Sequence, residues 1–70
     1  MDKLEILTEA HNQLASCRKS LILHLKYKKQ ILELEFYEDK TFWLLWINDV
    51  IDTDQKQIRL FKELLEKWSK

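Results

Sequence analysis

The chain contains no glycine and no proline among its 70 residues. Because these residues interrupt helices and mark turns more strongly than any others, their absence favours long, uninterrupted helices. It also excludes the glycine-rich loops that cradle phosphates and dinucleotides. The sequence therefore predicts an all-α protein without a P-loop or a dinucleotide-binding fingerprint.

Cysteine and histidine are also scarce. Cys17 is the only cysteine, so no disulfide within the chain supplements a small core, and we interpret it as a core residue. His11 and His24 lack the spacing of a helical zinc site, with neither an i, i+4 pair nor an H-E-x-x-H pattern. We expect no metal, no cofactor and no catalytic residues, and hence not an enzyme.

Long apolar runs are absent as well. The longest, from Phe42 to Ile47, has six residues, whereas a helix needs about 18 to span a bilayer. No basic stretch followed by an apolar one opens the chain. Aspartates follow the run and would be repelled by anionic lipids. We therefore expect no membrane association, a cytoplasmic location and one helical domain over residues 1–70.

What the chain does have is 46% apolar and 34% charged residues, with equal numbers of acids and bases. This composition is typical of helical proteins rather than of disordered ones. Asp2 and Glu5 have the spacing of a helix start, and no residue pattern interrupts the helix before Phe36 or Tyr37. We predict a first helix over about 2–37. Its apolar stripe consists of Leu4, Leu7, Ala10, Leu14, Cys17, Leu21, Leu25 and Leu32.

A polar stretch over 38–41 predicts a turn, with Asp39 or Thr41 as the cap of a second helix over about 42–69. The stripe of this helix consists of Trp43, Ile47, Val50 or Ile51, Ile58, Phe61, Leu65 and Trp68, interrupted at Asp54. The prediction is an antiparallel hairpin of two long helices. The alternative is a break near 52–55, which contains good N-cap residues, and a three-helix bundle.

The order of charges favours the hairpin. Folding the chain at residue 39 places a basic segment opposite acids of the second helix, a match that selects alignment more than it stabilises. The basic residues are Lys26, Lys28 and Lys29, and the acids are Asp49, Asp52 and Asp54. The same fold brings His24 level with Asp54, as a polar pair that fixes register. The alternative places both side chains in water at the edge of the stripe.

Two helices in a hairpin leave a second apolar stripe uncovered. This stripe consists of Leu23, Tyr27, Leu34, Phe42, Leu45 and Trp46. A third helix of the same chain, a second hairpin in a four-helix bundle, or a different protein would each cover it. We expect a homodimer or a hetero-complex. The leading hypothesis is a non-catalytic interaction module, a small chaperone, adaptor or inhibitor that buries this face against a partner helix.

The alternative hypothesis uses the basic segment 18–29, in which Tyr27 lies among lysines. Basic residues interleaved with an aromatic ring can hold phosphates and stack a base. A homodimeric helical regulator would then contact nucleic acid through Lys26, Lys28 and Lys29. The zero formal net charge of the chain argues instead for a solvated face on which acids neutralise these lysines.

Overall fold

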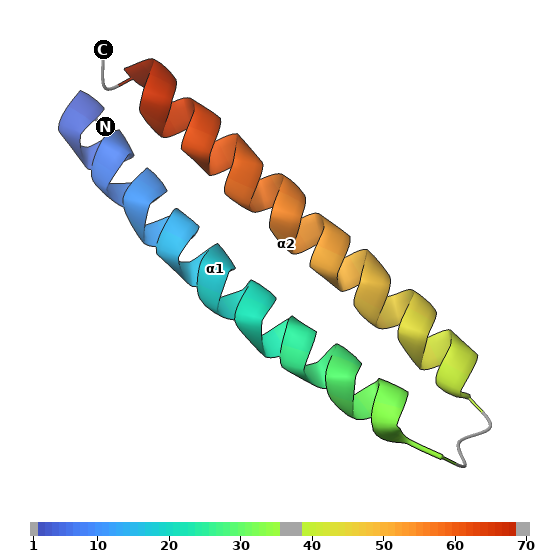
Figure 1. The fold of residues 1–70 in the computed structure, drawn as a ribbon. Coiled ribbons are helices and arrows are strands. Elements are labelled where there is room, and N and C mark those ends of the chain that lie inside the picture. The colour runs from blue at the N-terminus through green and yellow to red at the C-terminus, as the bar shows by residue number, and fades with distance from the viewer. Residues whose placement is uncertain (1, 36–38, 69–70) are drawn as a thin grey trace.

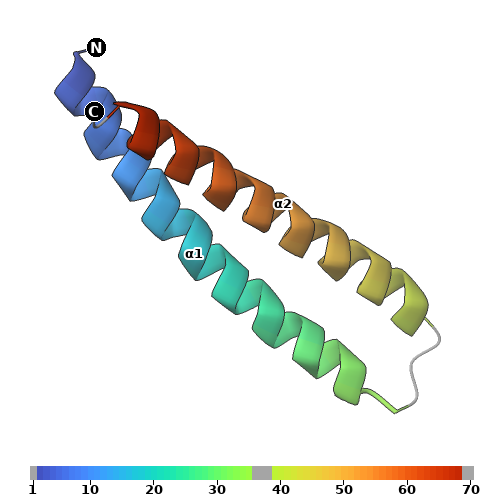
Figure 2. The ribbon, with the colours of Figure 1, turned by 45° about the horizontal axis from the view of Figure 1, so that its top comes forward.

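The computed structural model describes residues 2–35 and 39–68, and they form an antiparallel helical hairpin. Helix α1 spans Lys3–Glu33 and helix α2 spans Lys40–Trp68. The two helices run side by side, with both ends of the chain at the end of the hairpin opposite the turn (Figure 1). A second view, turned by 45°, shows the same arrangement (Figure 2). The predicted all-α hairpin is confirmed.

Helix α1 begins as predicted and ends earlier. The Asp2 Oδ1 atom accepts a hydrogen bond from the Glu5 N–H at 2.8 Å, which satisfies one of the free amides at the helix start. At the other end, Leu34 leaves the helical conformation with ψ of 120°. The predicted end at residue 37 is therefore wrong. Phe36 and Tyr37 lie outside the described residues.

A lysine from the next helix explains where α1 stops. The Lys40 Nζ atom donates to the carbonyl oxygens of Leu32 and Leu34, at 3.0 and 2.9 Å. A cation at the C-terminus of a helix satisfies free carbonyls and offsets the negative end of the helix dipole. This contact across the turn stabilises the end of α1, and local sequence signals in α1 do not reveal it.

Helix α2 begins at Lys40, two residues before the predicted start. The Trp43 N–H donates to the Asp39 carbonyl oxygen at 3.0 Å, so Asp39 precedes the first turn. Thr41, the other predicted cap, lies inside the helix, and that alternative is wrong. The predicted end at residue 69 lies outside the described residues.

The break near 52–55 does not occur, because α2 continues through these residues. Thr53 donates its hydroxyl to the Asp49 carbonyl at 3.0 Å, and Asp52 pairs with Lys56 at 2.9 Å. Both are contacts within a continuous helix. Asp54 points instead to α1. The three-helix alternative is therefore wrong.

Residues at three-and-four spacing make the contact between the helices. In α2 the predicted stripe is buried or half-buried throughout, and Asp54 is buried with it. In α1 the prediction holds from Leu7 to Leu21 and fails beyond. The packed residues of α1 are Leu7, Ala10, Leu14, Cys17, Leu21, His24, Lys28 and Ile31.

The stripe of α1 shifts because its spacing allowed two continuations from Leu21, four residues on to Leu25 or three residues on to His24. The structure takes the second, so Leu25 and Leu32 are 47% and 52% exposed. Leu4 is also exposed. The predicted α1 stripe is therefore wrong at these three leucines. The His24 contact with Asp54 occupies the position in the contact that the stripe prediction gave to Leu25.

The hairpin is a rod with little interior. Its radius of gyration is 16.0 Å, against about 11 Å for a compact domain of this length. Its accessible surface is 5782 Å², against roughly 4,700 Å² for a compact protein of this mass. Neither described helix combines the length and apolar character that crossing a membrane requires. A large share of the surface is thus available for contact with another molecule.

Candidate protein-binding face

A polar pair lies at the middle of the contact between the helices. The His24 Nδ1 and Asp54 Oδ2 atoms are 2.5 Å apart, and the two side chains are 22% and 10% exposed. Since a carboxylate only accepts, the imidazole N–H donates in this bond. The structure therefore brings together the two residues that the charge order aligned, and it satisfies a carboxylate that would otherwise be costly to bury.

Cys17 lies about two helical turns from His24 and is buried among the packed residues of α1. Its Sγ atom is 3.5 Å from the Gln57 Oε1 atom. A buried thiol held against a neighbouring side chain has the surroundings of a small core residue, whereas a nucleophilic cysteine is partly exposed in an electropositive site.

Beside each packed stripe runs a second line of residues with the same three-and-four spacing. We call the two lines together the neutral face. It consists of Gln13, Ser16, Ser20, Leu23, Tyr27 and Gln30 in α1, Leu34 directly after the end of α1, and Trp43, Trp46, Val50, Thr53, Gln57, Leu60 and Leu64 in α2. None of these residues carries a formal charge, in a chain that is 34% charged. Trp43 and Val50 are half-buried and also border the packed stripe of α2.

The two lines lie on the same side of the hairpin. Each residue of an α-helix is turned by about 100° from the one before it. Each line is reached from its packed stripe by stepping one residue back, for example from Lys28 to Tyr27 and from Ile51 to Val50. Because the helices face each other and run in opposite directions, a backward step leads to the same side in both. The neutral face is therefore one continuous surface across α1 and α2.

The structure brings four of the six predicted partner-binding residues onto this face. All six are exposed, from 39% for Tyr27 to 68% for Leu45. Leu23, Tyr27, Leu34 and Trp46 belong to the neutral face. The other two differ. Phe42 lies at its rim on the outer side of α2, and Leu45, two residues before the fully buried Ile47, points almost directly away from α1.

The apolar residues of the neutral face gather in the half nearest the turn. The Trp43 and Trp46 rings meet edge to face at 5.6 Å between centroids, a favoured aromatic geometry. The Phe42 ring is 5.8 Å from Trp43. In the half nearest the chain ends the face is mostly small and polar on α1, while α2 keeps Leu60 and Leu64. The face thus has a large aromatic and aliphatic end and a more polar end.

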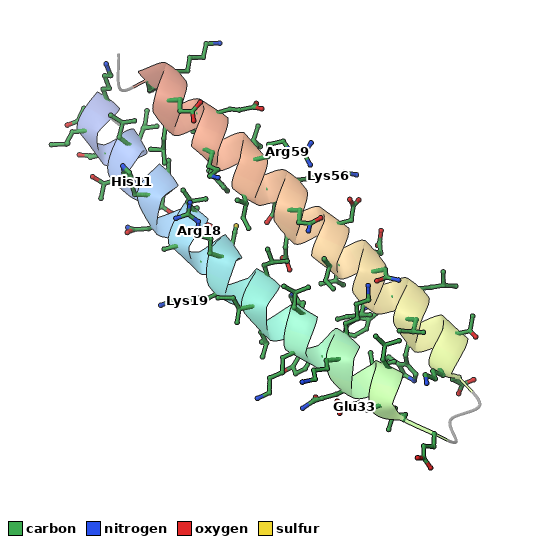
Figure 3. The ribbon with its side chains drawn as sticks, in the orientation of Figure 1. His11, Arg18, Lys19, Glu33, Lys56 and Arg59 are labelled. Atoms are coloured by element: carbon green, nitrogen blue, oxygen red, sulfur yellow. The ribbon has the colours of Figure 1, made fainter. Side chains whose placement is uncertain are left out.

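The opposite side of the hairpin has a different character. It carries charges along its length, at Arg18, Lys29, Asp52, Arg59 and Lys62. Leu25 and Leu32 lie exposed among them. Figure 3 shows Arg59 and Lys56 projecting from α2 away from α1, and Lys19 projecting from α1 away from α2. The two sides of the hairpin therefore differ sharply in charge.

The structure separates Lys28 from the other two lysines predicted to contact nucleic acid. Lys28 is half-buried in the contact between the helices, while Lys26 and Lys29 are exposed. Lys26 lies two residues from Lys28, which turns it about 160° around the helix. Two of the three aspartates predicted to face these lysines have other partners, since Asp52 pairs with Lys56 and Asp54 with His24. Lys26 and Lys29, three residues apart and both exposed, therefore share one side of α1, whereas Lys28 points toward α2.

The described residues form one shallow depression on the surface of α2. A depression of about 160 Å³ lies on α2, lined by Lys56, Arg59, Leu60 and Glu63. Ligand pockets are usually larger, at about 300–1,000 Å³. Residues 2–35 and 39–68 hold no group of three or more acidic, histidine or cysteine side chains placed to bind a metal ion.

Comparisons of the chain with models of protein families, with curated proteins and with solved structures found no match. The neutral face is therefore described from this chain alone. Sequence reasoning that follows apolar residues misses its serines, glutamines and Thr53. Their signal in the sequence is a missing charge, repeated at three-and-four spacing beside each packed stripe.

Proposed function

We propose that the protein is a non-catalytic interaction module that binds a helical partner through its neutral face. The observation that carries this proposal is the continuous uncharged surface across both helices of a chain with abundant charge elsewhere. Surfaces that meet water alone have no need to exclude charge, whereas the centre of a protein interface is depleted of it. A small chaperone, adaptor or inhibitor would act in this way.

The residues near the turn provide the driving force. Tyr27, Leu34 and Trp46 are each about 40% exposed, and full burial of a large side chain contributes roughly 1.5–3 kcal/mol. The surrounding serines and glutamines can be covered without the cost of desolvating an unpaired charge. Aromatic residues are also the most frequent anchors of protein interfaces.

Two neighbouring residues on α2 offer a matched test. Trp46 lies on the neutral face and Leu45 does not, although Leu45 is the more exposed of the two, at 68% against 42%. We expect Trp46→Glu to remove the protein from its complexes, while Leu45→Glu leaves them intact. Native mass spectrometry of the tagged full chain, purified from the cells that produce it, measures both outcomes.

A second matched pair on α1 serves as a control for the first. Tyr27 and Leu25 are both exposed, on the neutral face and on the opposite side respectively. Tyr27→Glu should reproduce the loss, and Leu25→Glu should not. Far-ultraviolet circular dichroism checks that every variant keeps its helix content. Equal effects of all four substitutions, or an effect of Leu45→Glu and Leu25→Glu alone, would contradict the proposed function.

A further inference from the structure

We infer that the occupant of the neutral face is a second copy of this chain, placed so that the turns of the two hairpins lie at the same end of a four-helix bundle. This inference rests on the proposed function, because it names the partner of the same face. Three features carry it: the absence of charge on the face, the distribution of its apolar residues along the hairpin, and the position of the first charges beyond it.

An uncharged surface is matched best by another uncharged surface. A partner with charges at its contact would leave them buried without counter-charges, which is costly. The opposite side of the hairpin, with Arg18, Lys29, Asp52, Arg59 and Lys62, would do so. The neutral face of a second copy would not. Of the two sides of a second copy, the neutral face is therefore the one that matches this surface in charge.

The distribution of apolar residues selects the orientation. A two-fold axis along the hairpin places α1 of one copy against α2 of the other. Each residue of α1 then lies at the same height along the bundle as the α2 residues that face it in its own chain. His24 and Asp54 mark one such level. Tyr27 then meets Val50 of the second copy, about one turn closer to the loop, and Leu34 meets Trp43 of the second copy, about three turns closer. The small Ser16 meets the larger Leu60 of the second copy toward the chain ends.

The opposite orientation fits less well. Reversing one copy end for end would lay Tyr27 on Ser20 of the second copy and Leu34 on its Gln13. Large apolar side chains would then cover small polar ones, and the apolar half of each face would stay partly uncovered. The arrangement with both turns at one end instead places the apolar halves together.

The first charges beyond the neutral face support the same orientation. Continuing each line toward the chain ends leads to Glu9 in α1 and Lys67 in α2, both exposed. They lie at about the same level, four turns from the His24 and Asp54 pair. With the turns together, Glu9 of each copy faces Lys67 of the other. Such rim pairs contribute to orientation more than to affinity.

The size of the surface is sufficient for a stable dimer. The Cα atoms of the hairpin extend over 52 × 18 × 14 Å, so its broad side covers roughly 900 Å², against about 800 Å² buried per partner in a standard interface. Its accessible surface of 5782 Å² also exceeds that of a compact protein of this mass by roughly 1,100 Å². Pairing through the neutral face removes an area of this order.

Sedimentation equilibrium of the purified full chain tests the choice of partner. We expect a dimer at micromolar concentration. Trp46→Glu and Tyr27→Glu should each raise the dissociation constant at least about 30-fold, as for an interface hot spot, while Leu45→Glu and Leu25→Glu should change it less than about threefold. Wild-type protein that stays monomeric at these concentrations would overturn the inference. The proposed function would then be tested by the effect of Trp46→Glu and Tyr27→Glu on the complexes purified from cells.

Distances between spin labels test the orientation. In a Cys17→Ala background, Glu35→Cys places one label beside the turn of each hairpin. With the turns together, the labels should be less than roughly 30 Å apart, since neighbouring helix axes are about 8–10 Å apart. With the turns at opposite ends, the 31 residues of α1 would separate them by roughly 45 Å or more.

The outcomes separate the two proposals. A dimer that depends on Trp46 and gives the short distance supports both. A dimer that depends on Trp46 and gives the long distance overturns the orientation and leaves the neutral face as the binding surface. A dimer insensitive to Trp46→Glu and Tyr27→Glu would overturn the inference, and the proposed function would then be decided by the effect of the same substitutions on complexes purified from cells.

Discussion

Replacing Asp54 by alanine tests whether the polar pair between the helices fixes their alignment. Asp54 is 7% exposed, and its carboxylate accepts the His24 N–H at 2.5 Å. A hydrogen bond to a charged group contributes about 1.5–3 kcal/mol. Since the His24 side chain is 22% exposed and regains some water when the bond is lost, we expect a cost of about 1.5–2 kcal/mol.

A loss of that size is easily measured. For a domain of 60–100 residues, 1 kcal/mol corresponds to about 4–8 °C in Tm, so Asp54→Ala should lower Tm by about 6–16 °C. Thermal unfolding followed by circular dichroism gives this value. All samples need the same protein concentration, because association with a second copy raises the apparent stability.

The double variant His24→Leu/Asp54→Leu distinguishes a coupled pair from two independent residues. Replacing both members of a buried polar pair by apolar residues is often neutral or stabilising, so we expect the double variant to unfold at or above the wild-type temperature. The exposed Asp49 offers a control, and Asp49→Ala should change the stability by less than about 0.5 kcal/mol. A double variant destabilised as much as Asp54→Ala, or more, would refute the reasoning.

Two further predictions concern the hairpin itself. Ile47 is fully buried, and Ile47→Ala should cost about 2–5 kcal/mol of unfolding free energy in urea titrations; a cost below 1 kcal/mol would contradict the packing described. Lys40 donates to two carbonyl oxygens at the end of α1, so Lys40→Met should cost about 0.5–1 kcal/mol. Hydrogen exchange should show the loss in the last turn of α1, and unchanged protection there would exclude this capping role.

The sequence was sufficient to predict the two helices and how they align in the hairpin. Asp2 starts α1 as its spacing with Glu5 predicted, and the α2 stripe from Trp43 to Trp68 packs as expected. Both signals are local or periodic. Folding the chain at residue 39 also aligned His24 with Asp54. The order of the basic and acidic residues along the chain was enough for this, because the hairpin has the predicted fold point.

The remaining errors have tertiary causes. The end of α1 depends on Lys40, which reaches it from the next helix. The shift of the α1 stripe from Leu25 to His24 depends on Asp54 in the other helix. Hydropathy alone predicted Leu25 rather than His24 as the next packed residue after Leu21. Nothing in the sequence of α1 indicates that the Asp54 carboxylate is buried opposite this position.

The neutral face was predicted in part, because Leu23, Tyr27, Leu34 and Trp46 are apolar enough to be noticed. Leu45 was included since it belongs to the same apolar run as Trp46, but one residue turns the side chain by about 100°. The polar members of the face were missed. Only the arrangement of the two helices shows that Ser20 and Gln57 continue the surface that Tyr27 and Trp46 begin.

The most direct test of the neutral face is a dilution series of amide spectra from ¹⁵N-labelled protein. As concentration rises through the dimerisation range, we expect chemical-shift changes concentrated at Ser20, Leu23, Tyr27, Trp46 and Val50. The opposite side, at Arg18, Leu25, Lys29 and Leu32, should change little. Changes concentrated on that opposite side, or none at any concentration, would contradict the account.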